Sequence, residues 1–159
     1  MPGKLTASDE EVVDAVVSAS RALVAVAARS LAGIGSDITL TQYQALVVLA
    51  SRGGQRAADL AVALDVSPST ATRMCDRLVR KGLIERNRPD EDRRALNIVI
   101  SDQGRMLLRQ VTRRRRAEVG RILEAMPSAG RAKLVVALRA FAEAAGEIPE
   151  QDWSLGWRE

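Results

Sequence analysis

Residues 67–101 read SPSTATRMCDRLVRKGLIERNRPDEDRRALNIVIS, and this stretch decides the fold. Ser67 and Pro68 predict the start of a helix, because serine caps free backbone N–H groups and proline at the first helical position loses no hydrogen bond. Gly82 predicts the end of that helix. Between them, apolar residues recur at the spacing of a helix that buries one face, at Ala71, Met74, Cys75, Leu78 and Val79.

The opposite face of this predicted helix carries mostly hydroxyl and guanidinium groups, which meet base edges and phosphates in a DNA groove. Its members are Ser69, Thr70, Thr72, Arg73, Asp76, Arg77 and Arg80. After the helix, residues 83–86 and 96–100 are typical of strands, and residues 87–94 form a charged loop with a Pro-Asp turn signal. The stretch therefore predicts a recognition helix followed by a wing.

Two arginines of the predicted helix are the candidates for reading bases. Arg73 and Arg77 are four residues apart and share one face, and an arginine can bond a guanine through two parallel hydrogen bonds, worth about 1–3 kcal/mol of discrimination. Alternatively, they pair with Asp76 or with phosphates, which positions the helix without reading sequence. Base and phosphate contact are both open for the hydroxyl groups at the helix start, which belong to Ser67, Ser69, Thr70 and Thr72.

Helical patterns cover most of the remaining chain. They predict helices over residues 8–32, 41–51, 57–64, 101–126 and 127–146. Ser8 is expected to cap the first of these, with Glu11 in the capping-box position, and Thr39 or Thr41 to cap the second. The short third helix and the helix from Ser67 then form a helix-turn-helix.

The order of these elements predicts a mainly α protein with a small β-hairpin wing, in the α+β class. A winged helix-turn-helix core would span residues 36–101. Residues 1–35 would supply an N-terminal tail and helix, and residues 102–159 two C-terminal helices and a tail. Because the outer helices have apolar faces with no partner in the core, they predict dimerisation and a two-fold homodimer.

Charge is distributed unevenly along the chain, although the net charge is only +4. Residues 52–116 hold 16 Lys and Arg against 8 Asp and Glu, whereas the remainder has a local charge of −4. A basic centre between acidic ends favours a polyanion partner. The alternative is that the arginines form ordinary solvated faces.

Composition also excludes several classes of function. The chain has no His and one Cys, which speaks against a Cys/His zinc site, a disulfide framework and Ser-His-Asp or Cys-His catalysis. We therefore expect no enzyme, no metal and no cofactor. No apolar run approaches the roughly 20 residues of a membrane span, and the N-terminal residues lack a signal-peptide core. We expect a cytoplasmic protein that does not enter a membrane.

Four motifs carry a family resemblance: LAVALDVS (60–67), TRMCDRLVRKGLIER (72–86), DRRAL (92–96) and ISDQG (100–104). With them, the chain resembles the MarR family of bacterial transcription regulators over nearly its whole length. The family usually has Thr where this chain has Ser101, which keeps the capping hydroxyl. The resemblance implies a homodimer that binds double-stranded DNA at a short pseudo-palindromic operator. It also implies release by small anionic or phenolic ligands, or by thiol oxidation.

Asp92 and Arg94 look like the wing pair of this family. A carboxylate two residues away can hold an arginine extended before DNA arrives. Arg94 would then reach the minor groove, whose narrow A·T-rich stretches concentrate negative potential. Arg93 and Arg88 are expected to contact phosphates or to remain solvated.

Two conspicuous features favour structural roles. The run Arg113–Arg116 lies in a predicted helix, where successive side chains point about 100° apart, so we expect its members to be solvated or paired with acids such as Glu118. Cys75 falls on the predicted buried face, where a thiol acts as a small hydrophobe. We therefore expect Cys75 in the core rather than as a redox sensor.

An effector pocket, if the chain has one, should lie between the winged core and the outer helices, against the first, second and fifth helices. Arg29, Tyr43 and Arg52 are candidates by helix position, with ordinary structural roles as the alternative. The leading hypothesis is a homodimeric, sequence-specific DNA-binding regulator, a repressor that a small-molecule effector releases. The alternative is a winged-helix dimer that acts mainly through protein contacts, with weak non-specific DNA binding.

Overall fold

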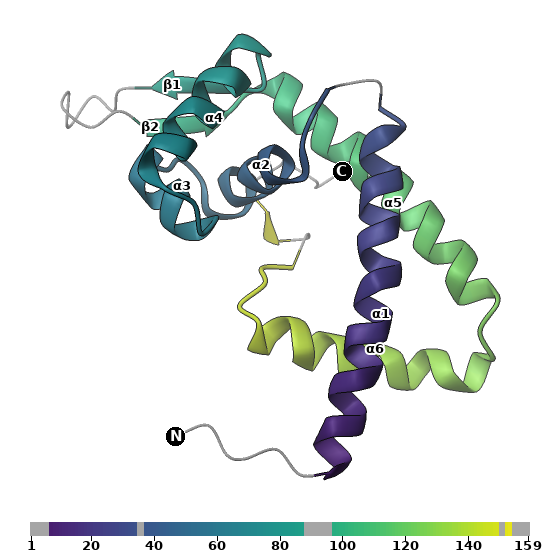
Figure 1. Ribbon diagram of the computed structural model, residues 1–159. Helices are drawn as coiled ribbons and strands as arrows, with labels where there is room; N and C mark the ends of the chain where they lie inside the picture. The colour runs from purple at the N-terminus through teal and green to yellow at the C-terminus, as the bar shows by residue number, and fades with distance from the viewer. Residues whose placement is uncertain (1–6, 35–36, 88–96, 150–151, 154–159) are drawn as a thin grey trace.

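The computed structural model describes residues 7–34, 37–87, 97–149 and 152–153. The elements in chain order are α1 (Ala7–Ala32), α2 (Leu40–Arg52), α3 (Ala57–Ala63), α4 (Pro68–Arg80), β1 (Ile84–Asn87), β2 (Asn97–Ile100), α5 (Asp102–Glu124) and α6 (Ser128–Ala144). Figure 1 shows α2, α3, α4 and the strands gathered in one lobe, from which α5 leads away toward α6. α1 packs along α5. The predicted mainly α fold with a two-stranded antiparallel sheet is confirmed.

The predicted helix boundaries agree within a few residues, with one correction, and one of the open alternatives is decided. α1 begins at Ala7, so Ser8 and Glu11 lie inside it and do not form its cap. Thr39, and not Thr41, caps α2. The Thr39 hydroxyl accepts from the Gln42 N–H at 3.2 Å, and Gln42 Oε1 accepts from the Thr39 N–H at 3.1 Å. This reciprocal capping box fixes where α2 begins.

The hydrophobic core lies in the winged lobe and under the first half of α5. Its fully buried side chains come from α2, α3, α4, both strands and α5, and include Leu46, Leu49, Leu60, Leu78, Ile84, Ile98, Leu108 and Val111. Among the described residues of α1, Leu31 near its C-terminal end joins this cluster, and Val26 is buried as well. Among the described residues, α6 contributes no buried side chain at all.

The two outer helices therefore leave large apolar side chains exposed. On α1 they are Val12, Val13, Val17, Leu23 and Val24, and on α6 they are Val135, Val136, Leu138 and Phe141. Burying an apolar side chain of this size is worth about 1.5–3 kcal/mol. Covering these faces with a partner would therefore be strongly favourable, and the single chain does not gain this free energy.

The wing sheet has one more member than the sequence indicated. β1 and β2 pair antiparallel, with Ile84 opposite Ile100 and Asn87 opposite Asn97. Gln55, which lies in the connection between α2 and α3, forms a bridge with Ile98 through hydrogen bonds of 3.0 and 2.7 Å. The bridge fixes the α2–α3 connection to β2.

The division into segments 1–35, 36–101 and 102–159 stays a prediction.

Ser101 joins the end of α4 to the start of α5. Its hydroxyl accepts from the Gly104 N–H at 3.0 Å, which caps α5 as predicted, and donates to the Gly82 carbonyl at 2.6 Å. Its own N–H donates to the Leu83 carbonyl at 3.1 Å. One buried serine thus holds α5 against the turn that follows α4.

Candidate nucleic-acid interface

Helix α4 is fixed at both ends by the residues that the sequence indicated. The Ser67 hydroxyl accepts from the Thr70 N–H at 3.2 Å, and Pro68 occupies the first turn. At the other end, Gly82 adopts a φ of +68°, which a glycine reaches without strain. The Leu83 N–H then bonds the Leu78 carbonyl at 3.0 Å. This is a Schellman motif, so the length of α4 is set by local chemistry.

The two faces of α4 are as predicted. Ala71, Met74, Cys75 and Leu78 are buried, and Arg73 and Arg77 are exposed one turn apart. Neither arginine side chain forms a hydrogen bond or an ion pair with the described residues. The alternative in which they pair with Asp76 is therefore wrong, and both guanidiniums are available to a partner outside the chain.

Asp76 instead pairs with Arg86 of β1, across ten residues of sequence. Both side chains are more than a third exposed, so solvent screens the pair and its contribution to stability is small. Its main effect is geometric, because it ties the middle of α4 to the first wing strand. Sequence reasoning missed it, since the pairing depends on where β1 lies after the turn.

The hydroxyl groups at the start of α4 differ in what they can offer a ligand. Ser67 is engaged with the Thr70 N–H and lies 2.9 Å from the Thr70 hydroxyl. Thr72 donates its hydroxyl proton to the Pro68 carbonyl at 3.0 Å, which leaves it an acceptor. Ser69 lies within 3.1 Å of the Ser67 hydroxyl. The Ser67 and Thr72 hydroxyls thus already donate their protons within the protein and are not free to donate to a ligand.

The wing candidates Arg88, Asp92, Arg93 and Arg94 lie outside the described residues. What the structure does give is the base of the wing, where the Asn87–Asn97 pair closes the sheet. This end of the two-stranded sheet lies in the same lobe as α4 (Figure 1).

Cys75 lies in the core, as expected. Its side chain is 1% exposed, and burial raises the pKa of the thiol above its ordinary value of 9.0, although the nearby Arg86 acts in the opposite direction. The thiolate is the reactive form of cysteine. The thiol is thus both inaccessible and protonated near neutral pH.

We expect a thiol reagent to label Cys75 in the native protein at least about 100-fold more slowly than in urea, because labelling requires the core to open. Stability should also fall as pH rises above 9.0. The unfolded thiol ionises there while the folded one keeps its proton, so the unfolded state is favoured. Absorbance-monitored labelling and urea titrations at pH 7 to 10 test both points. Labelling at equal rates with and without urea would contradict the buried position.

A cavity of about 610 Å³ lies between the winged lobe and the outer helices. Of the predicted effector candidates, Tyr43 and Arg52 line it and Arg29 does not. The Arg115 guanidinium carbon stands 5.2 Å from the Tyr43 ring centroid, within the range of a cation–π contact. The segment 145–148 and Trp153 line the cavity as well, and the Trp153 indole donates to the Ile148 carbonyl at 2.9 Å. No pattern in the sequence predicted where this tail lies.

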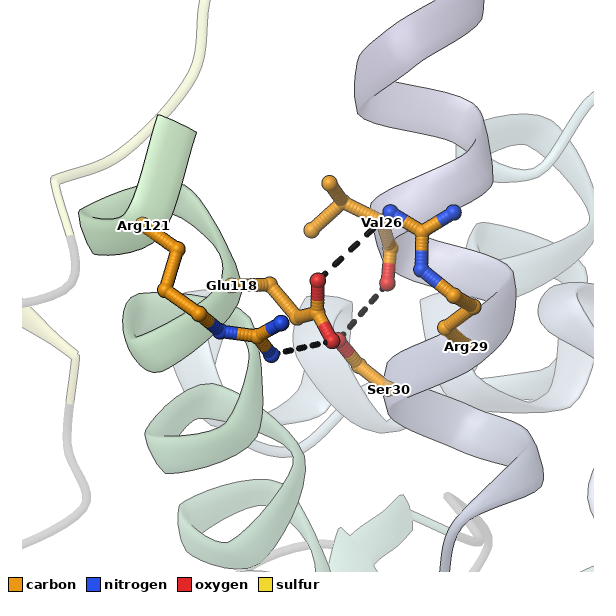
Figure 2. A network of polar contacts seen from close by, with 5 residues as sticks. All are labelled: Val26, Arg29, Ser30, Glu118 and Arg121. Carbon is orange, nitrogen blue, oxygen red and sulfur yellow. Dashed lines mark hydrogen bonds and ion pairs between the residues drawn. The ribbon is translucent and has the colours of Figure 1, made fainter. Parts of the chain in front are cut away.

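Arg29 takes part in a network between α1 and α5 (Figure 2). Glu118 accepts from Arg121 on its own helix at 2.6 Å and lies 3.5 Å from Arg29 on α1. Beside it, the buried Ser30 hydroxyl donates to the Val26 carbonyl at 2.7 Å. The arrangement gives Arg29 a structural role in joining the two helices.

The run Arg113–Arg116 disperses around α5, as its helical position predicts. Arg115 stacks on Tyr43, and the Arg114 guanidinium fills the space beside Gly33 at the end of α1. The acid expected to pair with this run, Glu118, is instead bonded to Arg29 and Arg121. Arg114 and Arg115 thus have separate surroundings, although they are adjacent in the run.

Two further observations concern the described part of the chain. None of its helices is long and apolar enough to cross a membrane. No group of three or more His, Cys, Asp or Glu side chains there is placed to hold a metal ion.

Similarity to known proteins agrees with this architecture. Residues 38–96 match the model of the MarR family. The HTH-type transcriptional repressor MdtR of Bacillus subtilis (strain 168) is 33% identical over 86 residues, which are 54% of this chain and 56% of MdtR. The chain thus spans about half the length of that curated relative.

Solved structures extend the likeness to nearly the whole chain. RV1404 from Mycobacterium tuberculosis is 43% identical, with a TM-score of 0.84 over 92% of this chain and 99% of that one. FabT of Streptococcus pneumoniae, solved in complex with DNA, has the same fold, with a TM-score of 0.65 at 23% identity over 86% of this chain and 96% of that one. The family match covers the winged lobe as far as residue 96, and the likeness to RV1404 extends over 92% of the chain: the chain belongs to the MarR family.

Proposed function

We propose that the chain is a homodimeric, sequence-specific DNA-binding transcriptional regulator, a repressor that a small-molecule effector releases. The observation that carries this proposal is the outward face of α4, where Arg73 and Arg77 are exposed and make no side-chain bond to the described residues. The repressor role is supported by the name of MdtR, and DNA binding by the FabT complex.

In the proposed dimer, two α4 helices enter successive major grooves about 34 Å apart, and the operator has half-sites about one helical turn apart. Asp76 and Arg86 hold α4 to the wing, so recognition helix and wing dock together. Arg94, supported by Asp92, is proposed to enter the minor groove, with Arg88 and Arg93 at phosphates. Each side of the dimer then makes several phosphate contacts, which predicts steep salt dependence.

The effector is proposed to occupy the cavity beside Tyr43 and Arg52. This cavity is bordered by α1, α2 and α5, and it also touches the end of α3. A ligand there contacts both the winged lobe and the outer helices, so it can favour one relative position of the two over another. An anionic or phenolic ligand suits the guanidiniums of Arg52 and Arg115.

Two alanine variants test the proposed reading face. Arg73→Ala and Arg77→Ala are each expected to weaken operator binding about 10- to 100-fold, the equivalent of losing a bidentate base contact. Footprinting on the DNA upstream of the protein's own gene first identifies the protected sequence. Fluorescence anisotropy on that DNA then measures the affinity. A base contact, when lost, relaxes specificity at one position, whereas a phosphate contact lowers affinity for all sequences and reduces the salt slope by about 1.

The matched control is Lys133→Ala, which removes a positive charge from the exposed surface of α6, at the far end from α4 (Figure 1). It should leave operator affinity within about twofold. If footprinting finds no protected palindrome, operator recognition is wrong. If Arg73→Ala, Arg77→Ala and Arg94→Ala all leave affinity and repression unchanged, the protein-contact alternative is favoured.

A further inference from the structure

A second cavity, of about 860 Å³, lies on another side of the winged lobe. Three parts of the chain border it: the α1–α2 connection, the α4–β1 turn and the first half of α5. Its lining residues are Ile34, Asp37, Lys81, Leu83, Gln103, Met106, Leu107, Arg109, Gln110 and Arg113. It shares no lining residue with the cavity beside Tyr43 and none with the outward face of α4.

One part of the cavity wall is apolar. Leu83 and Leu107 are nearly buried in the core beneath it, and Ile34 packs against the same core. Met106 of α5 also lines the cavity, and its side chain is 62% exposed. Methionine is flexible and adapts its shape to an apolar ligand.

The other part of the wall carries three cations, Lys81, Arg109 and Arg113, and one carboxylate, Asp37. Arg109 and Arg113 stand one helical turn apart on α5, so their side chains can reach the same point. Neither forms a hydrogen bond or an ion pair with any residue in the described part of the chain. Lys81 donates to the backbone carbonyl of Asp37, which uses one of its three protons.

We infer that this cavity binds a small amphipathic monoanion, a carboxylate with a short apolar tail. The head would lie between Arg109 and Arg113, with Lys81 nearby, and the tail along Leu83, Met106 and Leu107. Two guanidiniums can each donate two parallel hydrogen bonds to a carboxylate. The volume is within the 300–1,000 Å³ of small-molecule sites, and an apolar wall with a few convergent polar groups is typical of them.

This site goes beyond the proposed function, because its occupation does not depend on DNA. It does adjoin the recognition helix, since Lys81 is the C-cap residue of α4 and Leu83 belongs to the turn that ends it. A ligand here would therefore contact the base of α4 and the first half of α5 together.

Titration calorimetry without DNA, on the full chain, tests the site with octanoate as the probe. Octanoate should bind, and octan-1-ol and inorganic phosphate should each bind at least about tenfold more weakly, because each lacks one half of the recognition. Arg109→Gln and Arg113→Gln should each weaken octanoate binding at least about tenfold, and the double variant more. Lys133→Gln, which removes a charge from α6, is the matched control and should bind like the parent.

Each other outcome overturns the inference in a defined way. Octanoate binding that both Gln variants leave unchanged places the site elsewhere, for example beside Tyr43. Equal binding of octan-1-ol leaves only an apolar groove, and equal binding of phosphate leaves only an anion site. No octanoate binding at all means that the cavity is closed or filled in solution, as it would be if a second copy of the chain covered it. Far-ultraviolet circular dichroism on every variant checks that the fold is retained. Operator binding is measured separately, so a failure of this inference can be distinguished from a failure of the proposed function.

Discussion

Gly104→Ala is expected to destabilise the winged lobe strongly, because the start of α5 passes close to the α4–β1 turn at this glycine. A Cβ built at Gly104 would stand 2.2 Å from the Leu83 carbonyl oxygen and 2.8 Å from Ile100 Cγ1. The first of these is a backbone atom, which cannot rotate away as a side chain can. The clash is therefore relieved only if the start of α5 moves away from the α4–β1 turn.

That movement would break the bonds that hold the turn. Ser101 bonds the carbonyls of Gly82 and Leu83 with its hydroxyl and its N–H, and it also caps α5. Overpacking a well-packed site costs about 1–3 kcal/mol and occasionally more, and each lost hydrogen bond adds about 1 kcal/mol. We expect a loss of about 3 kcal/mol or more, out of the 5–15 kcal/mol typical of a domain. Urea unfolding followed by circular dichroism measures it.

Gly120→Ala is the matched control, because it makes the same change farther along α5. A Cβ there meets no described atom within 4 Å. Alanine is the better helix former by about 0.5–1 kcal/mol, so this variant should be as stable as the parent or slightly more so. If Gly104→Ala unfolds at the same urea concentration as the parent, the close approach of α5 to Leu83 is wrong.

Helix α4 could be predicted nearly to the residue because the signals that define it are local. Ser67, Pro68 and Gly82 act within one turn of themselves, and the apolar period between them identifies the buried face. The same reasoning placed Cys75 in the core and Ser101 at the start of α5. Where the local signal was ambiguous, as with Ser8 in the polar start of α1, the boundary was wrong.

Pairings between distant segments could not be predicted in this way. Asp76 with Arg86, Gln55 with Ile98 and Arg115 with Tyr43 all depend on where separate elements come to lie. Composition indicated that α5 is positively charged, but not what each arginine contacts. Arg113 lines a cavity, Arg114 lies beside Gly33 and Arg115 lies over the Tyr43 ring. The cavity beside Arg109 and Arg113 forms only when α5, the α1–α2 connection and the α4–β1 turn meet, so no linear motif marks it.

The exposed faces of α1 and α6 predict that a charge placed on α6 will break the proposed dimer. Phe141 and Leu138 are 56% and 50% exposed in the single chain, on a helix whose described residues bury nothing. A partner copy would cover them. Truncating a buried Phe costs about 3–5 kcal/mol, and a carboxylate in its place adds the cost of an unpaired buried charge. Phe141→Asp should therefore raise the dimer dissociation constant at least about 100-fold, measured by analytical ultracentrifugation.

Val62→Ser separates this effect from a general response to losing exposed apolar surface. Val62 is 83% exposed, more than Phe141, but it lies on α3 in the winged lobe. It should leave the dimer unchanged, because nothing in the proposed assembly covers it. Phe141→Asp should also weaken operator binding, since one half-site alone supplies only one reading helix, and higher protein concentration should restore that binding as dimers re-form. A Phe141→Asp protein that sediments as the parent does would show that α6 lies outside the dimer interface.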